Sequence, residues 1–247
     1  MRPRQDIDRI LRDWPYQPGE VNARLAYAED GREVLQMRIE LGLLQMETTH
    51  RPDGERPGGE ATYLDFLLRE SASRGERFEL SEAECAEVDR EFLQFYHRRI
   101  CWLAVQRFDL AIRDADHTLH LMDFVHEHSP IPQWTLSHEQ YRPFVLFHRT
   151  QAAALAGLDV AGPEKAIEEI QQGLERIENA FQRAGGEDPL DEDQMTGQLS
   201  RLLDWIRQHY RVRRTLSERL ADAVAAEEYE LAARLRDEIA RQRPRSP

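Results

Sequence analysis

Apolar side chains recur every three or four positions along most of this chain, and this spacing is what most limits its fold. An α-helix has about 3.6 residues per turn, so such a stripe covers one face of a helix. The pattern runs from Tyr63 to Ile239, interrupted by short stretches rich in glycine and proline. The faces between the stripes are polar, and 32% of all residues are charged. The sequence therefore predicts a mainly α-helical protein whose amphipathic helices share their apolar faces.

The N-terminal segment, residues 1–59, differs because its apolar residues alternate with a period of two. Alternating runs at 21–27 and 34–41 flank Asp30-Gly31, a pair that favours tight hairpin turns. We therefore expect a β-hairpin, with residues 42–46 extending its second strand. A lone hairpin is only marginally stable in water, so it should pack on the helices or on another subunit.

The hairpin is followed by residues 51–59, whose proline and glycine content predicts an irregular loop. Two readings of its arginines remain open. Arg51 and Arg56 either hold an anion or belong to a solvated connector.

The middle segment, residues 60–186, is predicted to be helical throughout. Its signals are a helix at 61–74 that stops at Gly75, a capping box from Ser81 to Glu84, a helix over 108–126, a helix that begins at Ser137, and one opened by Pro163.

Two stretches of this segment, 102–115 and 153–173, resemble helix pairs of the tetratricopeptide type. The first contains Phe-Asp-Leu-Ala-Ile at 108–112, which resembles the turn and second-helix entry of that repeat. In the second, small residues such as Ala154 and Gly157 would let paired helices approach closely. The resemblance implies stacked helix pairs with a concave peptide-binding surface, and a plain helical bundle is the alternative.

The last segment, residues 187–247, is predicted to form one long helix over 190–225 and a shorter helix after it. Leu216, Leu220 and Val224 form an apolar stripe on the first helix. A matching stripe on the second helix consists of Leu231, Leu235 and Ile239, with Tyr229 at an apolar joint and Ala232 and Ala233 leaving room for a close crossing. Two short helices cannot bury both stripes alone. They would pair with a second copy or a similar hairpin, or cap the helical segment within the chain.

This hairpin resembles a family known from bacterial proteins. Its core, Glu-Tyr-Glu-Leu-Ala-Ala-Arg-Leu-Arg-Asp-Glu-Ile at 228–239, is similar to the UvrB/UvrC motif, or UVR domain. In that family the hairpin joins the excision-repair helicase subunit to its nuclease partner. It also occurs in Clp-protease chaperones and in zinc-bearing activators of protein arginine kinases. The resemblance implies docking without catalysis, and the expected partner-binding residues are Leu216, Leu220, Tyr229, Ala232, Ala233, Leu235, Arg236, Asp237 and Ile239.

Motifs for catalysis are missing from the sequence. It has no phosphate-binding Gly-x-x-x-x-Gly-Lys-Ser/Thr loop, no Gly-x-Ser-x-Gly elbow and no paired Cys-x-x-Cys. His120, Asp123 and Glu127 share a helical face and could ligate a metal, or they are simply solvated. Cys101 is either an activated thiol or a buried structural residue. We expect a protein that is not an enzyme and uses neither cofactor nor metal.

Charge and composition limit the remaining functions. The net charge of -13 repels nucleic acid, and residues 214–247 balance 7 arginines with 7 acids. There is no run of apolar residues long enough to span a membrane, no secretion signal and only two cysteines, so we expect a cytoplasmic protein. The best interpretation is a protein-binding adaptor, with homodimerisation through the hairpin as one form of it. Two alternatives are a DNA-associated excision-repair accessory, supported by Arg211, Arg213, Arg214, Arg241, Arg243 and Arg245, and a metal-dependent hydrolase.

Overall fold

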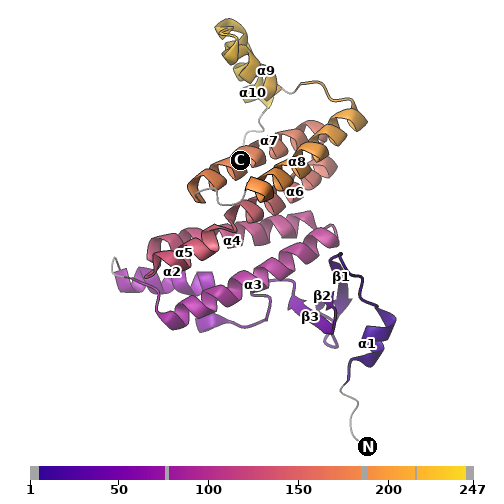
Figure 1. The fold of residues 1–247 in the computed structure, drawn as a ribbon, viewed down its shortest axis with the longest axis vertical. Coiled ribbons are helices and arrows are strands. Elements are labelled where there is room, and N and C mark those ends of the chain that lie inside the picture. Colours follow the sequence, from indigo (N-terminus) through magenta and orange to yellow (C-terminus); the bar gives the residue numbers. More distant parts are fainter. Residues whose placement is uncertain (1–5, 76–77, 185–188, 215, 243–247) are drawn as a thin grey trace, which may run out of the picture.

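The chain begins with a small antiparallel sheet and continues as a series of helices (Figure 1). The computed structural model describes residues 6–75, 78–184, 189–214 and 216–242. A short helix, α1 (Asp8–Asp13), precedes strands β1 (Asn22–Tyr27), β2 (Glu33–Ile39) and β3 (Gly42–Glu47). The helices that follow are α2 (Tyr63–Arg74), α3 (Glu82–Ala104), α4 (Phe108–His128), α5 (Pro132–Glu139), α6 (Arg142–Val160), α7 (Pro163–Ala184), α8 (Pro189–Tyr210), α9 (Leu216–Ala225) and α10 (Tyr229–Gln242).

The sheet is a three-stranded meander rather than the predicted two-stranded hairpin. Leu35 at the centre of β2 pairs with Leu25 on β1 and with Met46 on β3. Residues 42–46 do not extend the second strand, because the chain reverses at residues 40–41. Arg38 holds this reversal, with its Nη1 donating to the carbonyl oxygens of Gly42 at 2.8 Å and Glu40 at 3.2 Å. An arginine that caps a turn leaves no mark in the apolar pattern, and the sequence analysis therefore missed the third strand.

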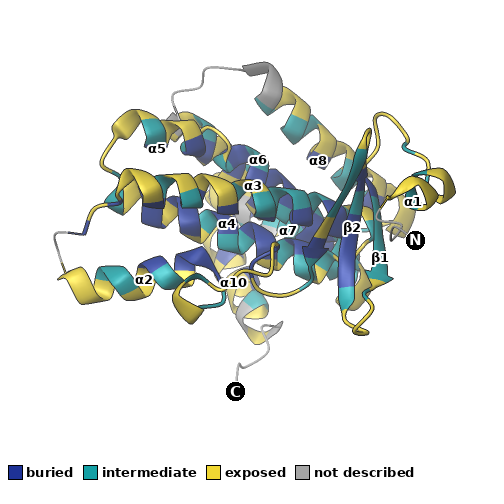
Figure 2. Cartoon of the chain, turned by 90° about the horizontal axis from the view of Figure 1, so that it is seen from below, coloured by how far each residue is buried: buried dark blue, intermediate teal, exposed yellow. Residues whose placement is uncertain are grey.

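The sheet packs against the helices, as expected for a sheet too small to be stable alone. Leu35 and Met46 are buried in one cluster with Cys101 and Trp102 of α3, and with Ala111 of α4. This cluster joins the N-terminal segment to the middle of the chain. Figure 2 shows the buried residues gathered between the elements and the exposed residues on their outer faces.

The helices form a layered array in which α3, α4, α6, α7 and α8 each pack on the next. Their predicted boundaries are confirmed at three places: Gly75 caps α2, Ser81 and Glu84 form a capping box at α3, and Pro163 begins α7. The two predicted helix pairs are present as α3–α4 and α6–α7. The tetratricopeptide resemblance itself stays a prediction. None of the described helices combines the length and apolar character needed to cross a bilayer.

Two predicted helix boundaries are wrong. Ser137 lies inside α5, which already starts at Pro132, and α6 begins only at Arg142. The long helix predicted over 190–225 ends at Tyr210, where Arg211 takes a left-handed conformation with φ of 53°. Apolar spacing continues across both breaks, so it could not reveal them. The predicted boundary at residues 186 and 187 lies outside the described residues.

A buried ion pair fastens the loop after β3 to the helices. Arg98 of α3 is 1% exposed and binds both carboxylate oxygens of Asp114 on α4, at 2.7 Å and 2.9 Å. Its Nη1 also donates to the backbone carbonyls of Glu47 and His50, at 3.0 Å and 2.7 Å. One guanidinium therefore connects two helices to the end of the sheet.

The loop arginine Arg51 is also buried, which contradicts both of its readings. Its side chain is 1% exposed and pairs with Glu87 at 2.8 Å and with the fully buried Glu91 at 3.7 Å. Glu91 in turn accepts hydrogen bonds from the backbone nitrogens of Tyr63 and Leu64 at the start of α2. Arg51 is thus part of an internal ion network and not a site for an external anion. Arg56, in contrast, is exposed, as the reading of a solvated connector predicts.

Helices α6 and α7 approach closely at Gly173. A Cβ atom added there would lie 2.1 Å from Cγ2 and Oγ1 of Thr150, well inside van der Waals contact. The added Cβ would also lie 2.6 Å from Thr150 Cβ, a distance that rotation of the threonine side chain does not change. The glycine is therefore required by the helix contact and not by its backbone conformation.

We predict that Gly173→Ala lowers the free energy of unfolding by about 1–3 kcal/mol, the usual cost of overpacking a core. Gly197→Ala on α8 is the matched control, because its Cβ would meet only Arg201 Nη1 at 3.4 Å. That control should be neutral or gain up to about 1 kcal/mol from helix propensity. Urea unfolding followed by circular dichroism measures both. Equal stabilities for the two variants would refute the close contact.

Candidate functional site

Helices α9 and α10 form a hairpin with a small core of its own. Ala223, Ala232 and Leu235 are buried against one another, and Leu216 and Leu220 pack on them. The connection at 226–228 ends α9 with a left-handed residue, Glu227, at a φ of 57°. The backbone nitrogen of Glu228 then donates to the carbonyl of Ala223 at 2.8 Å, a bond typical of a helix C-terminus that turns back.

The nine predicted partner-binding residues divide into two groups in this hairpin. Ala232 and Leu235 are 8% and 2% exposed, so their side chains hold the two helices together. Leu216 and Leu220 are half-buried along the same seam, and Ile239 is half-buried near the end of α10. The second group is exposed and consists of Tyr229, Ala233, Arg236 and Asp237. Only this second group is fully available to another molecule.

The interpretation of Tyr229 as an apolar joint is wrong. The side chain is 68% exposed at the first position of α10, and backbone hydrogen bonds close the turn without it. The inner stripe also differs from the predicted one, because Ala223 and not Val224 lies above Leu216. Successive helical residues are rotated by about 100° around the axis. Ala223, seven residues after Leu216, therefore points in nearly the same direction as Leu216, whereas Val224, eight residues after it, does not. Val224 is consequently 53% exposed.

The exposed apolar residues lie near the turn of the hairpin. Tyr229 and Leu231 line one shallow hollow on the surface, together with Arg234 and three glutamates, Glu227, Glu228 and Glu230. Leu231 is 39% exposed. Farther along α10, Arg236 pairs with its neighbour Asp237 at 3.0 Å. This end of the hairpin therefore presents an aromatic ring and an aliphatic side chain surrounded by charges.

The hairpin is attached to the helical array by few side chains. Its Glu218 accepts a hydrogen bond from Gln171 of α7 at 2.8 Å and pairs with Arg207 of α8. No larger contact between α9 or α10 and the array occurs among the described residues. Figure 1 shows the hairpin projecting beyond the end of α6, α7 and α8. Most of its outer surface is therefore accessible. Arg243 and Arg245 lie outside the described residues.

The residues weighed for catalysis are not arranged for it. Cys101 is fully buried, and burial raises the pKa of its thiol to about 12, so the thiol stays protonated at neutral pH. Asp123 pairs with Arg142 at 2.9 Å rather than with His120 or Glu127. Within the described ranges, no group of histidine, cysteine and acidic side chains is placed to hold a metal ion.

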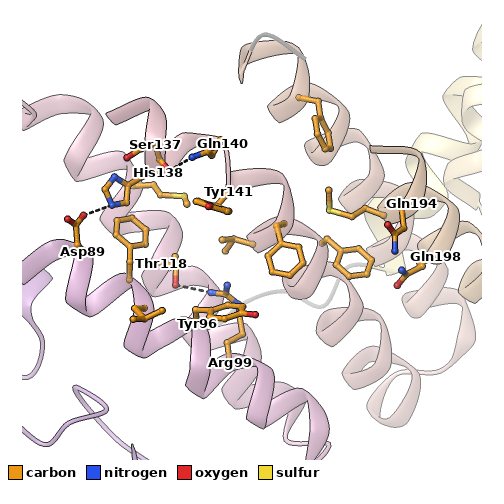
Figure 3. A pocket seen from close by; sticks show the side chains of 18 residues that line it. Asp89, Tyr96, Arg99, Thr118, Ser137, His138, Gln140, Tyr141, Gln194 and Gln198 are labelled. Atoms are coloured by element: carbon orange, nitrogen blue, oxygen red, sulfur yellow. Dashed lines mark hydrogen bonds and ion pairs between the residues drawn. The ribbon is translucent and has the colours of Figure 1, made fainter. Parts of the chain in front are cut away.

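A second feature, which the sequence analysis did not foresee, is a cavity of about 760 Å³ among α3, α4, α5, α6, α7 and α8 (Figure 3). Its walls carry aromatic residues, including Phe92, Tyr96, Phe144 and Phe147. Arg99 of α3 lines it as well and is only 2% exposed.

The base of this cavity is held by a short polar chain. Arg99 donates from Nη1 to Thr118 Oγ1 at 3.0 Å and from Nε to His148 Nδ1 at 3.4 Å. Burial and the neighbouring Arg99 lower the pKa of His148 to about 3, since both disfavour the imidazolium. Burial also lowers the pKa of Arg99 to about 10, which leaves the guanidinium charged at neutral pH.

We predict that His148 makes the fold sensitive to acid. The folded state holds its pKa below the ordinary value of 6.5, so unfolding takes up a proton and stability falls as pH drops from 6.5 towards 3. At pH 4.5 the loss from this residue should be about 3 kcal/mol.

The test of this prediction is His148→Gln, whose side-chain oxygen can still accept from Arg99. The variant should lose less stability between pH 7 and pH 4.5 than the wild type, in urea unfolding at each pH. His120→Gln, at an exposed site, is the matched control. Parallel pH curves for wild type and His148→Gln would contradict the prediction.

Comparison with known proteins gives one match. Neither the curated proteins nor the solved structures contain a match to this chain. Residues 211–242, which include α9 and α10, match the family model described as UvrB/uvrC motif. The C-terminal hairpin of this mainly helical chain is therefore a UVR motif.

Proposed function

We propose that this protein is a non-catalytic adaptor that docks onto a partner protein through its UVR hairpin. UVR motifs mediate contacts between proteins in general. The observation that carries the proposal is the exposed apolar end of a hairpin whose inner seam is already filled by its own side chains. Apolar residues that lie together on the surface, surrounded by polar ones, are typical of interaction sites.

Tyr229 is the expected anchor of this docking surface, which we define as Val224, Tyr229 and Leu231. Tyrosine is enriched among the few interface residues that carry most of the binding energy. Its ring offers a large apolar area with two side-chain torsions to order. The glutamates beside it, Glu227, Glu228 and Glu230, favour a partner with basic residues around an apolar site.

The partner that best fits this surface is a second helical hairpin of the same type. Such a hairpin presents exposed arginines, as Arg219, Arg234 and Arg236 do here, and these can meet the glutamates at the turn. The second hairpin can belong to another copy of this chain or to another protein. By the UVR resemblance, the adaptor serves DNA repair or regulated proteolysis in the cytoplasm.

We predict that Tyr229→Asp reduces partner binding at least tenfold, because it places a charge in the apolar centre of the interface. The full-length wild type and the variant are used as baits in extract of the source organism, and the captured proteins are quantified by mass spectrometry. Tyr27→Asp is the matched control, because Tyr27 is 77% exposed on β1, far from the hairpin in sequence. It should retain the partners of the wild type.

Circular dichroism and sedimentation velocity complete this test. Since Tyr229 is exposed, the variant should keep the helical content and melting temperature of the wild type. Sedimentation shows whether a second copy is the partner, in which case the wild type and Tyr27→Asp form dimers and Tyr229→Asp stays monomeric. The proposal fails if Tyr229→Asp captures the same proteins, in the same amounts and the same oligomeric state, as the wild type.

A further inference from the structure

The two adjacent arginines on α3 have opposite surroundings. Arg98 binds both oxygens of Asp114, whereas no carboxylate lies within 4 Å of the Arg99 guanidinium among the described residues. Arg99 instead donates to Thr118 of α4 and His148 of α6, and both of these acceptors are neutral. Its third nitrogen, Nη2, has no hydrogen-bond partner in the described part of the chain. Arg99 is therefore a buried cation with free donors at the wall of a cavity (Figure 3).

The carboxylates nearest to the cavity are already occupied. Asp114 is bound by Arg98 and also accepts from Arg113 Nη2 at 3.1 Å. Asp89, on the rim, pairs with His138 at 2.8 Å and accepts from Trp134 Nε1 at 3.0 Å. Both contacts of Asp89 are made through Oδ1, and neither Asp114 nor Asp89 forms an ion pair with Arg99 among the described residues. Asp114 acts on Arg99 only at longer range, where its charge raises the pKa of the guanidinium, and no carboxylate in the described part of the chain contacts Arg99 directly.

A buried charge without a partner is costly, and folded proteins keep such a charge where it serves a ligand or a reaction. The N–H groups of a charged guanidinium form short, charge-assisted hydrogen bonds to a carboxylate. The charge of Arg99 is retained at neutral pH, which supports this use.

We propose that the cavity binds an apolar monocarboxylate, with the carboxylate on the free Nη2 donors of Arg99 and the apolar body between the aromatic walls. Phe92 of α3 and Phe144 and Phe147 of α6 supply those walls. The rim glutamines of α8, Gln194 and Gln198, leave one side polar (Figure 3).

The charge count decides between a carboxylate and a phosphate. Arg99 is the one basic side chain, histidine aside, that lines the cavity in the described structure, and it already spends donors on Thr118 and His148. The Thr118 hydroxyl donates to the carbonyl of Asp114 at 2.8 Å, so it offers no proton to a ligand. A phosphate monoester carries nearly two charges and three acceptor oxygens, more than this site can satisfy. A single carboxylate matches it.

The volume limits the size of the ligand. Cavities of about 300–1,000 Å³ hold drug-sized molecules, and 760 Å³ lies within that range. The carboxylate can belong to a free organic acid or to the C-terminal residue of a peptide with apolar side chains. These two sources share the same chemistry, and the experiment below distinguishes them.

The experiment measures binding of two pairs of probes to the full-length protein by saturation-transfer NMR and titration. The first pair is 4-phenylbutyrate and 4-phenylbutanamide, and the second is acetyl-Leu-Phe with a free carboxylate or a terminal amide. We expect the acid of at least one pair to bind with a Kd of roughly 10 µM to 1 mM. Its amide should bind at least tenfold more weakly. The pair that shows this difference identifies the source of the carboxylate.

Arg99→Met assigns the binding to the cavity. It should abolish the preference for the acid over the amide. Its melting temperature should equal or exceed that of the wild type, because an unpaired buried charge is replaced by an apolar side chain. Arg98→Met, in contrast, leaves the buried Asp114 with Arg113 as its remaining arginine partner and should lower the melting temperature. Arg149→Met is the control for binding, since Arg149 pairs with Asp116 and does not line the cavity.

Two results would overturn the proposal: equal binding of acid and amide by the wild type, or no binding of either acid up to millimolar concentration. Both results are measured on the wild-type protein, so they can be obtained even if Arg99→Met fails to fold. Tyr229→Asp should bind the acid as the wild type does. The cavity and the docking surface therefore succeed or fail separately.

Discussion

The bond between Arg98 and Asp114 determines how the parts of this molecule are joined. A three-stranded sheet of this size cannot bury enough surface to be stable alone. Arg98 reaches from α3 to the carbonyls of Glu47 and His50 and so fixes the end of β3 against the helices. The pair is fully buried, and loss of Asp114 would leave the Arg98 charge uncompensated at the centre of the structure. The apolar cluster of Leu35, Met46 and Trp102 packs the sheet against the helices beside this ion pair, whose hydrogen bonds fix how the two parts are oriented.

The helical part of the fold could be predicted from sequence because its signals are local. Helix periodicity, the Ser81–Glu84 capping box, Gly75 and Pro163 each act within a few residues, and all are confirmed. The failures come from features that the spacing of apolar residues does not carry. The third strand depends on a turn held by Arg38, and the end of α8 depends on the backbone of Arg211. Ser137 shows the same limit, since a good capping residue can lie inside a helix when an upstream proline starts it first.

The docking hairpin was predictable as a motif but not in its detail. Residue types alone identify the two stripes and the family, and the family match at 211–242 agrees with them. Which residues face inwards depends on the angle between the two helices and on small differences in helical phase. For that reason Ala223 and not Val224 lies on the inner seam, and Tyr229 is exposed instead of buried at an apolar joint. The correction strengthens the argument for docking, because an aromatic ring needed inside the hairpin could not also bind a partner.

The cavity could not have been predicted, and Arg98 and Arg99 show why. They are adjacent, chemically identical and both buried, so the sequence does not show that their surroundings differ. Residues on one helix face about 100° apart, and that rotation directs Arg98 to Asp114 and Arg99 to Thr118 and His148. An arginine opposite a carboxylate is a structural bond. An arginine opposite neutral acceptors, beside an aromatic cavity, can instead bind the carboxylate of a ligand, as we propose for Arg99. The difference between Arg98 and Arg99 lies in whether a neighbouring helix places a carboxylate opposite the guanidinium. Only the tertiary structure shows which residues lie there.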